Sequence, residues 1–518
     1  MISLQLSPSA KPLRAAWRNC TTVGRAYDLV REDILSHLRL AQKEIGFNYC
    51  RFHGLFHDDM GVVKRRDDGT LSFHWHHVDK IYDSLLAMQL RPFVELNGMP
   101  RALASGTKTV FHYGLNITPP RDYAEWGRLV GEFAVHVIDR YGLEEVRKWY
   151  FEVWNEPNLD CFWTGDQASY FRLYETSARA LKQVDSQLRV GGPATAMSAW
   201  IPDTIDYCER NGVPLDFVST HIYPHDEQIH YGTRAQSPFP MSGFLGAQVQ
   251  KVFDQVRDSS RPNLEIHWTE WNAQTAVDKA TVTFMNNRYL DTTYAAALIA
   301  RNAIDFDAIT DSFAWWVISD IFEEHPIPSA PYSATYGALT IHGIPKASYN
   351  AFRLLARLAG NRLDASVPDN APSGCGVVAT RQLATTHVLL WNHHFAEEPA
   401  RLPWTDSIQI PVATSNDFIL TLTTIRAGKG SARETWEQMG KPINLSRAQE
   451  AMIRDHAEPD HRFLRVTPHD GVIDVPFELF SNEVQHIECR PIEIDALPKD
   501  QEANLALLEA QLGDMTRQ

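Results

Sequence analysis

The chain has 518 residues, of which 44% are hydrophobic and 22% charged, and its formal net charge is −15. This length exceeds what one hydrophobic core normally organises, so at least two domains are expected. The acidic balance argues against a nucleic-acid partner, which requires a basic face. The N-terminal run MISLQLSPSAKPLRAAW lacks the segments of a signal peptide, and no apolar run reaches the length of a membrane span. A cytoplasmic protein without a membrane partner is therefore expected.

Strand-like and helix-like segments alternate from residue 15 to residue 360. The strand candidates are AAWRNCTTV, NYCRFHG, RPFVELN, WYFEVWNEPN, LRVGGPA, FVSTHIYP, EIHWTEWN and SFAWWVIS. Helical spacing predicts helices over 33–46, 76–90, 121–142, 168–185, 199–212, 247–257, 289–306 and 346–360. Eight strand–helix units predict an α/β fold of the (β/α)8, or TIM barrel, type over 15–360. The competing doubly wound sheet would carry a Gly-rich turn after its first strand, and this sequence has none there.

After residue 360 the pattern changes to short alternating runs. The turn-rich segment ASVPDNAPSG is followed by CGVVATRQ, THVLLWNHH, SIQIPV, DFILTLTTI, GVIDVPFEL and EVQHIEC. This alternation predicts an accessory antiparallel β-sandwich over 361–496, to which residues 1–14 donate a strand. A last helix is expected in 497–518, with its leucines on one face. The sandwich or this helix offers a surface for a homo-oligomer.

Two glutamates stand at the ends of predicted barrel strands. Glu156 lies in Trp-Asn-Glu-Pro-Asn after the fourth strand, and Glu270 lies in His-Trp-Thr-Glu-Trp-Asn at the seventh. Barrel active sites gather at the C-terminal strand ends, so both carboxylates are expected in one crevice. Hydrolysis of a glycosidic bond needs such a pair, one to protonate the leaving oxygen and one to attack. Ionised Glu270 would hold the pKa of Glu156 above that of an ordinary Glu.

Each of these residues has an ordinary structural alternative. A single Glu at a strand end is more often salt-bridged than catalytic, and Glu270 alone would favour that interpretation. The four-residue match around Glu156 and the shared crevice favour catalysis for the pair. Glu95, at the end of the third strand, is interpreted as a supporting partner. Asn155 is placed to hydrogen-bond a sugar 2-hydroxyl.

Other strand ends carry groups suited to sugars. Aromatic faces stack on sugar rings, and His, Arg and carboxylates bind hydroxyls. The candidates are Arg51 and His53 on the second strand, His221 and Tyr223 on the sixth, and Trp315, Trp316, Asp320 and Glu323 on or after the eighth. One of the two adjacent tryptophans must face the barrel interior, and the sequence leaves open which one. His267 is interpreted as a core histidine.

No metal or other cofactor is expected. Histidines cluster with Asp58 and Asp59, and again over 74–77, but neither group has the spacing of a known metal motif. The second cluster precedes a helix start, where polar residues are common. The six cysteines are widely scattered without a CxxC pair, so neither a zinc site nor a disulfide framework is indicated.

Several stretches resemble a known family. CRFHGLFHDDMG, MPRALASGTKTVF, NITPPRDYAEW, FEVWNEPNLDCFW, VGGPA and SDIFEE are similar to glycoside hydrolase family 39, and within it to bacterial β-xylosidases. The resemblance implies retention of configuration, with Glu156 as acid/base and Glu270 as nucleophile. It also implies sugar contacts from His53, Asn155, His221, Trp316 and Glu323, with Phe162 or Trp163 near the mouth of the site. Residues 221–246 depart from the xylosidase pattern.

The leading hypothesis is an exo-acting enzyme that releases β-D-xylosyl residues from xylo-oligosaccharides. Another retaining β-glycosidase or an endo-glycanase of the same family is the alternative. An iduronidase would need cations near the sugar carboxylate, whereas Asp320, Glu323 and Glu324 follow the eighth strand. A non-catalytic carbohydrate-binding protein would normally have lost Glu156 or Glu270, and both are present.

Overall fold

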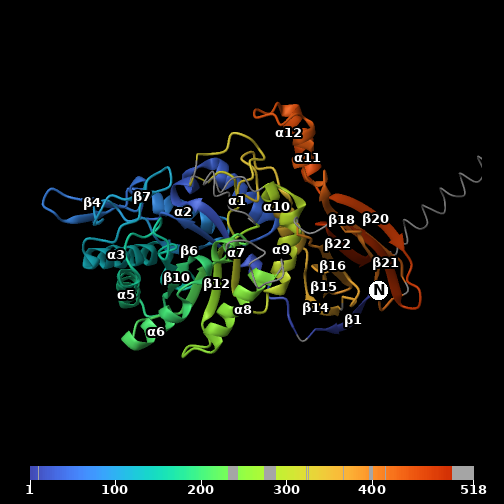
Figure 1. The fold of residues 1–518 in the computed structure, drawn as a ribbon, viewed down its shortest axis with the longest axis horizontal. Coiled ribbons are helices and arrows are strands. Elements are labelled where there is room, and N and C mark those ends of the chain that lie inside the picture. The colour runs from blue at the N-terminus through green and yellow to red at the C-terminus, as the bar shows by residue number, and fades with distance from the viewer. Residues whose placement is uncertain are drawn as a thin grey trace, which may run out of the picture.

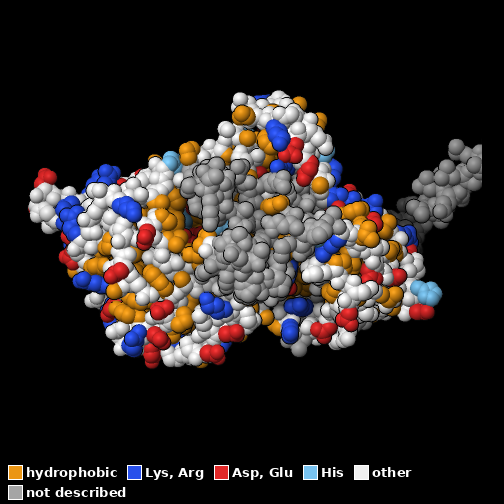
Figure 2. Space-filling model, viewed as in Figure 1, with side chains coloured by type: hydrophobic (Ala, Val, Ile, Leu, Met, Phe, Trp, Pro, Cys, Tyr) orange, Lys and Arg blue, Asp and Glu red, His pale blue; other side chains and the backbone are white. Residues whose placement is uncertain are grey.

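The computed structural model describes residues 1–9, 11–231, 243–273, 288–322, 324, 326–365, 367–395, 401–414 and 416–492. The expected C-terminal helix over 497–518 lies outside these residues. No helix in the described ranges has both the length and the apolar character needed to cross a membrane. On the face drawn in Figure 2, acidic and basic side chains are interspersed over the described surface.

The predicted barrel is confirmed. Within the described residues, eight parallel strands follow one another around a sheet in chain order. They are β2 (Cys20–Arg25), β3 (Tyr49–His53), β6 (Arg91–Leu96), β9 (Tyr150–Val153), β10 (Arg189–Thr195), β11 (Phe217–His221), β12 (Glu265–Trp271) and β13 (Ser312–Trp315). The first and last strands complete a nearly closed barrel, where the Thr22 hydroxyl donates to the Trp315 carbonyl at 2.7 Å. β2 and β11 are buried along their whole length, as expected for strands covered on both faces.

Helices cover the outside of this sheet (Figure 1). They are α1 (Glu32–Glu44), α2 (His76–Ala87), α3 (Tyr123–Tyr141), α4 (Leu143–Val146), α5 (Gln167–Val184), α6 (Ile201–Asn211), α8 (Gly243–Arg257), α9 (Thr293–Asp305) and α10 (Ala347–Leu355). The short helix α7 (Asp226–Tyr231) lies instead in the loop that follows the C-terminal end of β11. Eight of these match the helices that the spacing predicts, with ends that differ by a few residues. α5 shows the reason, because Phe171, Tyr174, Ala178 and Leu181 are buried along one face.

Two small hairpins lengthen loops at the C-terminal ends of barrel strands. β4 (Val63–Arg65) pairs with β5 (Leu71–Phe73) after β3, and β7 (Thr109–Val110) pairs with β8 (Leu115–Asn116) after β6. The second hairpin turns through Phe111, whose φ is +61°. The sequence predicts neither hairpin, because strands this short carry no detectable periodicity.

The second domain contains the predicted sheet. Its strands are β14 (Asn361–Ala365), β15 (Cys375–Gln382), β16 (Thr385–Asn392), β17 (Trp404–Pro411), β18 (Phe418–Ala427), β19 (Gly430–Ser431), β20 (Asp460–Val466), β21 (Val472–Leu479) and β22 (Val484–Pro491). β1 (Ile2–Pro8) joins this sheet between β14 and β17. The pairing of these described strands is antiparallel except where β1 pairs with β17 and β18 pairs with β19. Alternate residues of β21 are buried, and they pack with inward side chains of the other strands in a separate hydrophobic core.

Two helices in this domain were not expected from the sequence. α11 (Arg433–Gln438) and α12 (Arg447–Ala457) form the projection at the top of Figure 1. They are tied to the barrel by Asn350 of α10, whose amide donates to the carbonyls of Gly430 at 3.0 Å and Ala457 at 2.7 Å. α9 and α10 also pack against the sheet, so the two domains share a packed boundary.

Candidate active site

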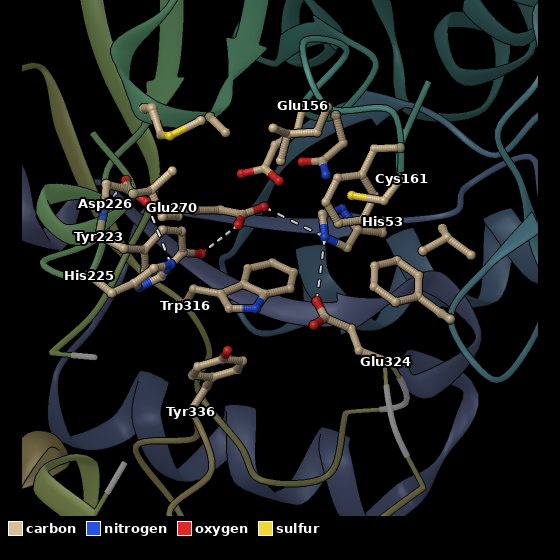
Figure 3. A pocket seen from close by; sticks show the side chains of 18 of the residues that line it. His53, Glu156, Cys161, Tyr223, His225, Asp226, Glu270, Trp316, Glu324 and Tyr336 are labelled. Carbon is tan, nitrogen blue, oxygen red and sulfur yellow. Dashed lines mark hydrogen bonds and ion pairs between the residues drawn. The ribbon is translucent and has the colours of Figure 1, made fainter. Parts of the chain in front are cut away.

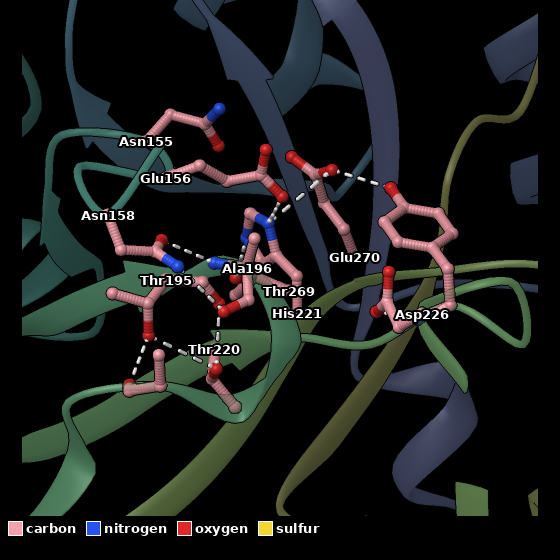
Figure 4. A network of polar contacts seen from close by, with 12 residues as sticks. Asn155, Glu156, Asn158, Thr195, Ala196, Thr220, His221, Asp226, Thr269 and Glu270 are labelled. Atoms are coloured by element: carbon pink, nitrogen blue, oxygen red, sulfur yellow. Dashed lines mark hydrogen bonds and ion pairs between the residues drawn. The ribbon is translucent and has the colours of Figure 1, made fainter. Parts of the chain in front are cut away.

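The two predicted carboxyl groups meet at the C-terminal end of the barrel. Glu270 lies on β12, and Glu156 follows β9 with its backbone at φ +44°. Both side chains are buried. One carboxylate oxygen of each, together with a ring nitrogen of His221, lie within 4.8 Å of one another. The barrel therefore brings two residues that are 114 positions apart in the sequence into contact with the same small space (Figure 4).

The Trp-Asn-Glu motif has a packing reason as well as a chemical one. The Trp154 ring is buried against Trp163, with ring centroids 4.9 Å apart, and its N–H donates to the Phe162 carbonyl at 3.0 Å. The Glu156 backbone N–H donates to the Ala194 carbonyl of β10 at 2.8 Å. A positive φ is uncommon for a residue with a side chain, and these contacts hold Glu156 in it.

Arg51 of β3 connects the polar residues of the site. Its guanidinium is fully buried and donates to Glu152 at 2.6 Å, to Glu270 at 2.7 Å and to Asn155 at 2.9 Å. A further contact of 2.7 Å joins it to Glu95. Burial lowers the pKa of Arg51, but the three carboxylates together raise it well above its usual value. A permanent positive charge therefore lies beside Glu270.

Glu270 receives hydrogen bonds that stabilise its charged form. Tyr223 donates its hydroxyl to Oε2 at 2.7 Å, while Arg51 donates to Oε1. Burial raises the pKa of Glu270 above its ordinary value, although Arg51, His53 and the Tyr223 hydrogen bond each act to lower it. The carboxyl is therefore buried and yet surrounded by donors, which is the environment that a carboxylate nucleophile requires.

Glu156 has a different environment. Its Oε1 lies 2.9 Å from Nδ1 of His221, and no guanidinium group is within ion-pair distance among the described residues. Burial raises the pKa of Glu156 well above the ordinary value, and the charge of Glu270 raises it further. The direction agrees with the expectation from the sequence, but burial is the larger cause. Two carboxyls with such different partners are suited to separate acid and nucleophile roles.

His53 ends β3 between several partners. Its Nδ1 lies 2.8 Å from Oε2 of Glu95, and its Nε2 is 3.6 Å from Glu270 and 3.8 Å from Glu324. Burial lowers the pKa of His53 to about 3, so its ring is neutral. The ring also packs against Trp316 at a centroid distance of 4.6 Å. Glu95 has the supporting position that its sequence context suggests.

These groups line a cavity of about 510 Å³ (Figure 3). The cavity is lined by His53, Val110, Phe111, His112, Asn155, Glu156, Leu159, Cys161, Phe162, Ala196, Met197, Tyr223, His225, Asp226, Ile229, Glu270, Trp316, Glu324 and Tyr336. Among these described residues, four are acidic and none is Lys or Arg. One wall comes from the β7–β8 hairpin, whose His112 N–H donates to the Glu324 carbonyl at 3.3 Å.

The structure places most of the predicted site residues together. His53, Asn155, Phe162, Tyr223 and Trp316 line the cavity. Arg51 and His221 lie directly behind it and contact Glu270 and Glu156. Glu323 lies outside the described residues, so its predicted sugar contact stays a prediction.

The structure also shows which of the adjacent Trp315 and Trp316 faces the site. Trp316 lines the cavity, whereas Trp315 packs outward against Trp271, with ring centroids 5.3 Å apart. Asp320 lies apart from the cavity lining in an ion pair with the fully buried Lys346, at 2.7 Å. Trp163 packs beneath the cavity lining, so Phe162 is the aromatic residue of this pair that reaches the cavity.

Some residues of the site were not singled out from the sequence. Phe111 and His112 lie in a hairpin far from the catalytic motifs, and Glu152 and Thr269 lie inside the barrel. Asp226 also lines the cavity, where its carboxylate accepts the Tyr223 backbone N–H at 2.8 Å. Only the position of Glu152 and Thr269 on the strands that lead to Glu156 and Glu270 could have indicated them.

The ligand atoms of Glu156, His221 and Glu270 have a spacing that could also hold a cation. They form the one such set of His, Cys, Asp and Glu side chains in the part of the chain that the structure describes. The Glu270 oxygens, however, already accept hydrogen bonds from Arg51 and Tyr223. These donors satisfy the carboxylate without a cation, so the geometry gives no reason to include a metal in the chemistry.

Comparisons with known proteins agree with this geometry. The profile of Glycosyl hydrolases family 39 matches residues 1–474. A protein named Beta-xylosidase from Caldicellulosiruptor saccharolyticus is 41% identical over 438 residues, which are 84% of this chain and 86% of that protein. A second Beta-xylosidase, from Geobacillus stearothermophilus, is 37% identical over 486 residues, 92% of this chain and 93% of that protein. The crystal structure of the GH39 enzyme from Xanthomonas axonopodis pv. citri matches with a TM-score of 0.85 and 30% identity, covering 95% of this chain and 97% of that one.

Proposed function

This chain belongs to glycosyl hydrolases family 39 and is a glycoside hydrolase, and we propose that it removes terminal β-D-xylosyl residues from xylo-oligosaccharides with retention of configuration. Glu156 is the proposed acid/base and Glu270 the proposed nucleophile. The two relatives named Beta-xylosidase support the choice of sugar, because each aligns over more than four-fifths of this chain.

The separation of the two carboxyl groups is the observation that carries the retaining mechanism. Retaining enzymes hold their carboxyls about 5 Å apart, whereas inverting enzymes need about 6.5–9.5 Å to fit a water molecule between carboxylate and sugar. An oxygen of Glu156 and an oxygen of Glu270 lie within 4.8 Å of each other. Such a close approach of two carboxyl oxygens supports a retaining pair and direct attack by a carboxylate.

The proposed reaction has two steps. In the first, a Glu270 oxygen attacks the anomeric carbon as the bond to the leaving oxygen breaks, and Glu156 donates its proton to that oxygen. The product is a covalent glycosyl ester on Glu270 and an ionised Glu156. In the second, Glu156 accepts a proton from water while the water oxygen attacks the anomeric carbon, which releases the sugar and regenerates both groups.

The cavity lining supports a small neutral sugar. Phe111, Phe162 and Trp316 provide apolar walls, and His53 and Glu324 provide polar groups for hydroxyls. Glu324, which is adjacent to Glu323, is the described residue that we propose for this role. A uronic acid would bring its own carboxylate into a space with four described carboxyl side chains and no described Lys or Arg in the lining, so an iduronidase is disfavoured.

A panel of nitrophenyl glycosides tests the substrate. The β-D-xyloside is expected to be hydrolysed far better than the β-D-glucoside, because a rigid aromatic wall excludes a C6 hydroxymethyl group. The α-L-arabinoside, which differs at C4, should be intermediate. Preference for the glucoside, or cleavage only within long chains, would replace the xylosidase proposal with the alternative of another retaining glycosidase or an endo-glycanase. Proton NMR of the first-formed sugar tests retention separately.

A further inference from the structure

A continuous chain of polar contacts runs behind the proposed acid. Oε1 of Glu156 lies 2.9 Å from Nδ1 of His221, and Nε2 of the same ring lies 3.1 Å from the Thr269 hydroxyl. Thr269 lies 2.9 Å from Oε1 of Glu152, whose Oε2 accepts from Arg51 at 2.6 Å. All five side chains are buried. His221 therefore has one ring nitrogen toward the proposed acid and the other toward the barrel interior (Figure 4).

The donors and acceptors in this chain can be assigned from its inner end. Glu152 is paired with the permanently charged Arg51, so it is ionised and can only accept. The Thr269 hydroxyl has a single hydrogen, and it donates this hydrogen in its hydrogen bond to Glu152. The Thr269 oxygen must then act as the acceptor toward His221, which places the ring hydrogen on Nε2. In a neutral imidazole this leaves Nδ1 without a hydrogen.

We propose that Glu152 and Thr269 are positioning residues that fix His221 in the Nε2–H tautomer, so that its bare Nδ1 accepts a hydrogen bond from the carboxylic OH of Glu156. The inference rests on the proposed role of Glu156 as the acid. Under this arrangement the free enzyme holds Glu156 in the protonated form that the first step consumes. After the proton is donated, the Nδ1 lone pair faces a carboxylate, which favours recapture of a proton from water.

The remaining groups around His221 fit this assignment. Nη2 of Arg51 is 3.5 Å from Nε2, but its two hydrogens already reach Asn155 at 2.9 Å and Glu95 at 2.7 Å. Oε2 of Glu270 is 3.6 Å from Nδ1, beyond the 2.9 Å contact with Glu156.

The charged form of the ring is disfavoured as well. Burial, with the nearby Arg51 and His53, lowers the pKa of His221 well below its usual value. The reverse tautomer would require a protonated Glu152, and the buried ion pair between Glu152 and Arg51 would then be lost.

The closing experiment compares the pH dependence of kcat/KM in variants of residue 269, using the full chain. Thr269→Val keeps the shape of the side chain and removes the hydroxyl, and Thr269→Ser restores it. Thr310→Val is the matched control, because Thr310 is equally buried and its hydroxyl donates to the Phe306 carbonyl away from the site. Each is assayed on methyl β-D-xyloside, whose leaving group needs a proton, and on 2,4-dinitrophenyl β-D-xyloside, whose leaving group does not.

Thr269→Val is expected to shift the basic limb of kcat/KM for the methyl xyloside to lower pH by about one unit. The reason is that His221 can then turn its N–H toward an ionised Glu156 and stabilise it. Above neutral pH its kcat/KM on that substrate should fall by about tenfold, with little change on the dinitrophenyl xyloside. Thr269→Ser should restore the basic limb, and Thr310→Val should leave it in place.

Two other results have separate meanings. If the basic limb and the leaving-group dependence of Thr269→Val equal those of the wild type, the tautomer assignment is overturned while the acid role of Glu156 stands. If Thr269→Val loses activity equally on both substrates, the residue has a general structural role and the proposal is again wrong. A wild-type enzyme that shows no basic limb on the methyl xyloside would instead contradict the acid role itself.

Discussion

Replacing Tyr223 by Phe isolates the effect of one hydrogen bond on the proposed nucleophile. The Tyr223 hydroxyl donates to Oε2 of Glu270 at 2.7 Å, and Glu270 is buried while Tyr223 is half-buried. A hydrogen bond to a charged group contributes roughly 1.5–3 kcal/mol. Because the bond favours the ionised carboxylate, its loss raises the pKa of Glu270. At 1.36 kcal/mol per pH unit, the rise is about one to two units. The acidic limb of kcat/KM should therefore move to higher pH by that amount.

The assay is kcat/KM on 4-nitrophenyl β-D-xyloside from acid to neutral pH. A good leaving group makes the rate depend on attack rather than on proton donation. Tyr49→Phe is the matched control, because Tyr49 begins β3 at the opposite end of the barrel and donates to the Lys148 carbonyl at 2.9 Å. An acidic limb that stays in place or moves to lower pH in Tyr223→Phe would refute the reasoning, provided that the thermal unfolding curves of the two variants agree.

Two further predictions concern the acid and the stability of the barrel. Glu156→Ala should lose activity mainly on substrates with poor leaving groups, and added azide should restore turnover of activated substrates by forming a β-glycosyl azide; no azide product and equal losses on both substrate types would contradict its role. Lys346→Met should destabilise the fold by about 3–5 kcal/mol, because it leaves Asp291 and Asp320 buried without the ammonium that now lies 2.6 and 2.7 Å away. Urea unfolding measures this loss, and a change below about 1 kcal/mol would contradict the stabilising role of this buried ion pair.

The convergence of Glu156 and Glu270, the proposed catalytic pair, could be predicted from the sequence because barrel geometry determines where the strand ends lie. Because the strands of the barrel are parallel, the C-terminal ends of β9 and β12 lie at the same end of the barrel. Glu156 and Glu270 therefore converge there for any conformation of the connecting loops. Arg51 and His53 were expected in the site for the same reason, because they lie at the end of a barrel strand. Trp315 and Trp316 could not be distinguished in this way, because the alternation of a strand is lost where the strand ends, and β13 ends at Trp315.

Residues inside the barrel were harder to identify. Glu152 lies just before the Trp-Asn-Glu-Pro-Asn motif and Thr269 lies directly before Glu270, but a polar residue in a strand gives no sign of whether it faces a salt bridge, a ligand or solvent. Phe111 and His112 reach the cavity only because a hairpin folds over it, and loop paths are not encoded in local periodicity.

Helix α12 differs from these residues, because the sequence contains a recognisable signal for the start of this helix. Ser446 and Gln449 form a reciprocal capping box, a signal that the dominant strand pattern of the region obscured.

The most direct test of the account is to identify the residue that becomes glycosylated. A 2-deoxy-2-fluoro-β-D-xylosyl substrate with an activated leaving group slows hydrolysis of the intermediate more than its formation, so the covalent enzyme accumulates. Peptide mass spectrometry of the trapped protein should place one fluoroxylosyl group on Glu270, in the segment His-Trp-Thr-Glu-Trp-Asn. A label on Glu156 or on any other residue, or a product of inverted configuration formed without a label, would contradict the assignment of Glu270 as the nucleophile.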